Sequence, residues 1–118
     1  TPRVLRRLRE ASALFFSSLG LPEMISLFAL WEAERRISEK DYAALRRELA
    51  RDMEQTQLVS PDGEILRWAV ECVEVQGLKT LEAVHVATAR RMRCGRFLTA
   101  NRAQARAARS LGLTVEVL

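Results

Sequence analysis

Short strand-like runs alternate with longer segments of helical periodicity, and this alternation constrains the fold more than any other feature of the sequence. The run Ala13–Ser18 is apolar and closed by small residues, which is typical of a buried parallel strand. Further strands are expected at Thr56–Val59, Phe97–Ala100 and Leu113–Leu118. Because helical segments separate these strands, we expect a single α/β domain over residues 1–118, with a central parallel sheet covered by helices on both faces.

The intervening segments carry signals for the beginning and end of helices. Pro22 and Glu23 are favoured in a first helical turn, and they predict a helix that ends near Arg36. Ser38 and Asp41 have the spacing of a capping box and open a second helix, so these two segments predict a helical hairpin. Further helices are expected from Thr1 to about Glu10, between Gly63 and Gly77, over Leu78–Met92, and from Asn101 to about Leu111.

Composition is that of a small globular protein. The chain has 118 residues, of which 48% are hydrophobic, enough for one core without a disulfide or a structural metal. Its longest uncharged run, Ala11–Pro22, is too short to span a bilayer, and no segment resembles a signal peptide, so we expect a cytoplasmic protein with no membrane contact. Cys72, Cys94 and a single histidine are too few for a usual zinc site, so we interpret the cysteines as free thiols.

Positive charge is concentrated towards the carboxyl end of the chain. No acid occurs between Ala83 and Val115, where seven arginines fall, whereas the remainder carries 12 basic and 15 acidic residues. Such a region favours an anionic partner such as nucleic acid. The alternative is an ordinary arginine-rich surface, because 17 of the 19 basic residues in the chain are arginine.

Three polar residues lie where ligands bind in open parallel sheets. Glu23 follows the first predicted strand, Glu82 opens a helix, and Asn101 lies at the junction after the strand Phe97–Ala100. Carboxylates brought to one sheet edge can hold a hard divalent cation. Each residue also has a structural explanation, because acids in a first helical turn and Asn at an N-cap stabilise helices without any ligand.

Two segments near the carboxyl end resemble a known family. The segment Leu81–Ala89 (LEAVHVATA) and the segment Phe97–Arg102 (FLTANR) resemble the paired motifs of PIN domains, in particular those of the VapC-type toxins. The resemblance implies a PIN-like three-layer α/β/α fold with a protruding helical hairpin. It also implies an endoribonuclease that uses Mg²⁺ or Mn²⁺ to hydrolyse RNA, as the toxin of a toxin–antitoxin pair.

The resemblance also assigns roles to particular residues. Glu23 matches the second acid of the family, Glu82 the third and Asn101 the fourth, and Thr99 matches the small hydroxyl residue before the fourth acid. Glu23 and Glu82 are therefore the expected metal ligands, and these two residues with Asn101 are the expected catalytic set. His85 matches the histidine of the helix motif, and we expect it to have a structural role in the helix layer.

The chain departs from the PIN pattern in three ways. The first acid of the family lies in an opening strand at the centre of the sheet, whereas this sequence starts at Thr1, so we expect an upstream segment of the native protein to supply that strand. Glu82 stands where Asp is usual, which keeps the charge but moves the carboxylate by about one bond length. Asn101 replaces an acid by a neutral amide and should weaken the hold on a metal.

Two hypotheses of different class follow. The first is a metal-dependent endoribonuclease that uses Glu23 and Glu82 together with an aspartate from the expected upstream strand. The second is a catalytically degenerate PIN domain that binds RNA or protein. In both, Arg102 and Arg106, one helical turn apart beside Asn101, are expected to bind the RNA backbone. The resemblance further implies a homodimer and a cognate antitoxin protein.

Overall fold

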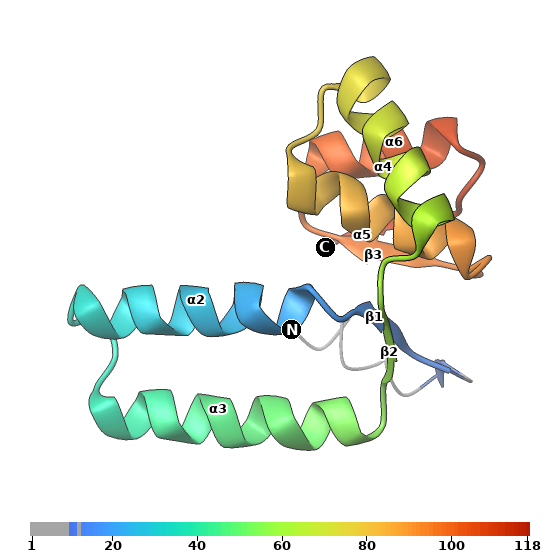
Figure 1. Cartoon of the computed structure of the whole chain (residues 1–118). Coiled ribbons are helices and arrows are strands. Elements are labelled where there is room, and N and C mark those ends of the chain that lie inside the picture. Colours follow the sequence, from blue (N-terminus) through green and yellow to red (C-terminus); the bar gives the residue numbers. More distant parts are fainter. Residues whose placement is uncertain (1–9, 12) are drawn as a thin grey trace.

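The structure is a computed structural model that describes residues 10, 11 and 13–118. These residues form a mixed α/β protein of short strands and longer helices (Figure 1). The expected helix from Thr1 lies outside the described residues, apart from its end. In chain order the elements are β1 (Phe15–Ser17), α2 (Gly20–Ala33), α3 (Glu39–Glu54), β2 (Gln57–Val59), α4 (Gly63–Gln76), α5 (Thr80–Arg91), β3 (Phe97–Thr99), α6 (Arg102–Ser110) and β4 (Val115–Val117).

The strands are parallel, as the alternation with helices predicts, but in the described residues they form two separate sheets. Strand β1 pairs with β2, with Phe16 opposite Leu58, and β3 pairs with β4, with Leu98 opposite Glu116. The expected continuous central sheet is therefore not formed by the described part of the chain, because β1 and β3 are not hydrogen-bonded to each other. The three-layer arrangement around one sheet stays a prediction.

A cleft of about 790 Å³ lies between the two sheets. Residues of β1 line one side of it, the segment that leads into β3 lines another, and the α5 residues His85, Thr88 and Ala89 also face it. Its lining combines apolar residues, such as Phe15 and Leu98 on opposite strands, with charged residues such as Arg93 and Arg96. The cleft therefore separates β1 from β3.

The expected hairpin is formed by α2 and α3, which run side by side and extend away from the rest of the protein (Figure 1). The capping box predicted for the second helix is present: the Ser38 hydroxyl accepts from the Asp41 amide, and the Asp41 carboxylate accepts from the Ser38 amide, both at 3.0 Å. No residue of α3 is buried, and Phe28 of α2 packs against Trp31. The hairpin is therefore held mainly by local contacts.

The hydrophobic core lies among α4, α5 and α6. It is built largely of small side chains, which lets the helices approach closely. Its fully buried members include Ile65 of α4, Val86 of α5 and Ala107 of α6. At the start of α4, Asp62 accepts from the Ile65 amide at 2.8 Å, and this bond, followed by the ion pair with Arg91, lowers the pKa of the Asp62 carboxyl. Arg91 thus links the end of α5 to the start of α4.

Within the described part of the chain, no helix combines the length and the apolar character that a membrane-crossing segment requires.

Ile65 is the largest side chain in this core with no exposed surface, so its truncation should destabilise the protein most directly. We expect Ile65→Ala to lower the free energy of unfolding by about 2–5 kcal/mol, because it removes buried methyl groups and leaves a cavity. Val75 lies on the same helix with 70% of its surface exposed, and Val75→Ala should change the free energy of unfolding by less than about 0.5 kcal/mol. Urea denaturation followed by circular dichroism measures both, and equal effects would contradict this core.

Candidate functional site

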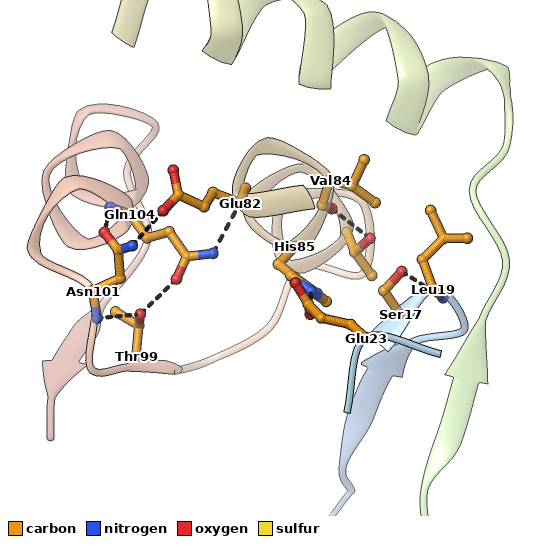
Figure 2. Close-up of polar contacts among 10 residues, drawn as sticks. Ser17, Leu19, Glu23, Glu82, Val84, His85, Thr99, Asn101 and Gln104 are labelled. Carbon is orange, nitrogen blue, oxygen red and sulfur yellow. Dashed lines mark hydrogen bonds and ion pairs between the residues drawn. The ribbon is translucent and has the colours of Figure 1, made fainter. Parts of the chain in front are cut away.

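Glu82 and Asn101 are brought into direct contact at the start of α5. The Asn101 side-chain amide donates to Glu82 Oε2 at 2.5 Å (Figure 2). The Lys79 backbone amide donates to Glu82 Oε1 at 3.0 Å. Both carboxylate oxygens of Glu82 are therefore engaged by donors of the protein itself. Asn101 is also the N-cap of α6, because its Oδ1 accepts from the Gln104 amide at 3.0 Å.

Thr99 and Gln104 complete a closed ring of hydrogen bonds around this contact. The Thr99 hydroxyl donates to Gln104 Oε1 at 2.7 Å and accepts from the Asn101 amide at 3.0 Å. The Gln104 side-chain amide donates to the Glu82 backbone carbonyl at 3.2 Å (Figure 2). The ring joins the end of β3 to the first turns of α5 and α6, and Thr99 is 93% buried within it.

Glu23 lies near the same end of α5, where it contacts His85. Glu23 Oε1 lies 2.8 Å from His85 Nε2, and the exposed fractions of the two side chains are 42% and 18%. Phe16 of β1 stacks on the histidine ring with a centroid separation of 6.1 Å. The imidazole of His85 therefore lies between the Phe16 ring of β1 and the Glu23 carboxylate. The sequence predicts a structural role for His85 in the helix layer but does not indicate the contact with Glu23.

Gly20 allows Phe16 to take that position. A Cβ atom at Gly20 would collide with the Phe16 ring, so a larger residue would displace the ring that stacks on His85. The apolar run that predicts β1 therefore also supplies a wall of the site. This dependence is not visible in the sequence, because no local pattern shows that Gly20 packs against the Phe16 ring.

The two contacts lie within one helical turn of each other. Glu82 and His85 are three residues apart on α5, so their side chains occupy neighbouring positions on one helix face. Glu23 approaches that face from α2 and Asn101 approaches it from the start of α6 (Figure 2). The structure therefore brings all three sequence-predicted residues, Glu23, Glu82 and Asn101, to one end of α5.

Glu23, Glu82 and Asn101 come from three segments, and each offers an oxygen atom. Only the two glutamates are acidic, because Asn101 is a neutral amide. No group of three or more histidine, cysteine, aspartate or glutamate side chains is placed to hold a metal ion among residues 10, 11 and 13–118. Burial raises the pKa of both cysteine thiols, which keeps Cys72 and Cys94 protonated at neutral pH. The site accordingly offers hard oxygen donors and no thiolate.

The arginines between Ala83 and Val115, where no acid occurs, differ in the contacts that they make. Arg91 pairs with Asp62 and Glu64, Arg96 pairs with Glu116, and Arg90 lies 4.4 Å above the Trp68 ring. Arg102, Arg106 and Arg109 on α6 are exposed and form no ion pair with any residue that the structure describes. Their spacing places them along one face of α6 over about 10 Å, starting beside Asn101.

Gln104 is the residue of this site that the sequence analysis does not identify. It lies three positions after the N-cap Asn101, which is the position of the second partner in a capping box. That spacing could have drawn attention to it. Its bonds to Thr99 and to the Glu82 carbonyl depend on tertiary packing and have no local signal.

No family model matches the chain, and no curated protein matches it.

The contact between Asn101 and Glu82 predicts that Asn101→Asp destabilises the protein at neutral pH. Aspartate keeps the helix cap but places a second carboxylate against Glu82, so we expect a loss of about 1–3 kcal/mol in the free energy of unfolding. The repulsion raises the pKa of one carboxyl in the folded state above its unfolded value. Stability should therefore recover at low pH and be lost as the pH rises through that raised folded pKa.

Asn101→Ser is the matched control, because serine caps a helix without adding a charge. Thermal unfolding of both variants between mildly acidic and neutral pH measures the difference. A pH dependence of Asn101→Asp equal to that of Asn101→Ser would contradict the contact with Glu82.

Proposed function

We propose that this chain is a PIN-like domain that hydrolyses RNA phosphodiester bonds with Mg²⁺ or Mn²⁺, as the toxin of a toxin–antitoxin pair. The observation that supports the proposal best is the convergence of Glu23, Glu82 and Asn101, from three distant segments, on one end of α5. The motifs Leu81–Ala89 and Phe97–Arg102, which carry the resemblance, contain two of these residues and most of the hydrogen-bonded ring.

The donor set fits a cation whose coordination shell is completed by water and by phosphate oxygens of the substrate. Mg²⁺ is usually held by one or two carboxylates, several waters and substrate phosphate oxygens, and not by an all-protein cage. Glu23 and Glu82 supply two partly exposed carboxylates of this kind. When bound, the ion would supply hydroxide from water near neutral pH and offset the charge that develops on the phosphate.

The residues of the chain have separate tasks in this proposal. The Asn101 amide holds the Glu82 carboxylate in place through a hydrogen bond, and His85 holds Glu23. The exposed arginines of α6 bind the phosphate backbone and lead it towards Asn101. Phe16 and Phe15 make the neighbouring wall of the cleft apolar, which limits the access of water to that side.

The three-layer PIN architecture is part of the same proposal. A strand seated in the cleft between β1 and β3 would unite the two parallel sheets, and the family carries its first acid on such a strand. The proposal also includes a cytoplasmic location, a homodimer, and an antitoxin segment that covers Glu23 and Glu82.

One observation favours a second candidate, a catalytically degenerate domain that binds RNA. Both oxygens of Glu82 already accept hydrogen bonds from the protein, so a cation would share each oxygen with a protein donor. Asn101 also adds no negative charge to the site. This candidate predicts RNA binding through α6 without cleavage.

Cleavage of a mixed RNA pool distinguishes the two candidates. The intact gene product should cleave RNA when Mg²⁺ or Mn²⁺ is present, and Glu23→Gln and Glu82→Gln should each lower the rate by at least about 100-fold, because each removes a ligand charge. Glu48→Gln, on the exposed face of α3, is the control and should cleave normally. RNA binding with no cleavage by the folded wild-type protein would reject the nuclease and leave the binding domain.

The arginine face of α6 predicts a specific salt dependence of RNA binding. The double variant Arg102→Gln, Arg106→Gln should weaken binding for all sequences and reduce the slope of log K against log salt by about 0.7 for each lost phosphate contact. Arg46→Gln, Arg47→Gln removes the same charge from exposed positions of α3 and should leave the slope unchanged. Fluorescence anisotropy over a salt series measures the slopes, and equal slopes in the two double variants would contradict an RNA site on α6.

A further inference from the structure

An apolar stripe lies exposed on the outer face of α4. Leu66, Val70 and Val73 have exposed fractions of 51%, 55% and 41%, although Ile65, Ala69 and Cys72 on the adjacent side of the same helix are buried in the core. Their spacing of four and three residues places them in one line along the helix. A helix that exposes an apolar stripe beside its buried side is typical of an element that packs against a further partner.

A groove runs beside this stripe. It has a volume of about 330 Å³ and is lined by the stripe together with Ala69 and Glu74 of α4 and with Thr80 and Val84 of α5. The groove is apolar and shallow, and its size suits an aliphatic side chain from an approaching helix. Val70, at the middle of the stripe, projects from the same surface. The surface therefore presents a projecting side chain, Val70, beside a groove that can receive an aliphatic side chain.

The charges that flank the stripe indicate what covers it. Arg67 and Glu74 are exposed, lie seven residues apart on the same flank of α4, and form no ion pair within the described part of the chain. When two copies of this helix pack antiparallel across a twofold axis near Val70, the same flanks of the helices meet. Arg67 of each copy then approaches Glu74 of the other, so the surface is complementary in charge to itself.

We propose that this face of α4 and the adjoining groove form the interface of a homodimer of this chain. The twofold axis passes near Val70, the valine of each copy packs at the groove of the other, and two Arg67–Glu74 pairs border the contact. This assigns a surface to the dimer of the proposed function, but it does not rest on RNA cleavage. The contact involves little more than one helix and its groove from each copy, so we expect a small interface, at or below about 1,200 Å² in total, and dissociation on dilution.

Sedimentation equilibrium over a dilution series tests the interface without reference to activity. The wild-type chain should show a concentration-dependent dimer, and Val70→Asp should raise the dimer dissociation constant by at least about tenfold, because it places a charge at the centre of the contact. Val75→Asp is the matched control on the same helix, 70% exposed and off the stripe, and should dimerise like the wild type. Circular dichroism confirms that each variant is folded.

A charge exchange tests the antiparallel arrangement. Arg67→Glu and Glu74→Arg should each weaken the dimer, because each brings like charges together, and the double variant should restore it. Val70→Cys should also form an intermolecular disulfide on oxidation, whereas Val75→Cys should not. The proposal is overturned by a wild type that stays monomeric, by a dimer equally insensitive to both aspartate variants, or by a double variant that fails to recover.

Discussion

The burial of α5 is the constraint on which the rest of the structure depends. Six of its 12 residues are buried, and the helix contacts α4, α6 and β1. Most of these residues are alanine or valine, because neighbouring helices could not approach from several sides around larger side chains. Glu82 and His85 lie on the side that remains partly exposed. The position of the candidate site therefore follows from the face that α5 does not bury.

The polar ring at the start of α5 explains why an amide suits position 101. That side chain must accept from the Gln104 amide as a helix cap and at the same time donate to the Glu82 carboxylate. Asparagine can do both, whereas an ionised aspartate can only accept. Every buried side-chain nitrogen or oxygen atom among the described residues has a hydrogen-bond partner, and this includes those of the ring. Glu82 is thereby held in place at the start of α5.

The elements of the fold could be predicted because their signals are local. The apolar run before Gly20, the Ser38–Asp41 capping box, the Gly77 helix end with its left-handed backbone and the Asn101 cap all act over a few residues, and each expected helix and strand among the described residues is present with small shifts at its ends. The pairing of the strands into a sheet was predicted less well than the positions of the strands. Strand pairing depends on which strands become neighbours in space, and the described strands pair as two separate sheets.

The sequence by itself determined the order of the helices and strands, the caps that begin and end the helices, and the residue types at the site, because these are properties of short segments. Only the tertiary structure decided that Glu23 contacts His85, that Gln104 closes the ring, and that Arg96 is paired with Glu116 while the exposed Arg102 forms no ion pair with any described residue. These contacts join residues from different elements of the fold. They form only when packing brings those elements together, so no local pattern encodes them.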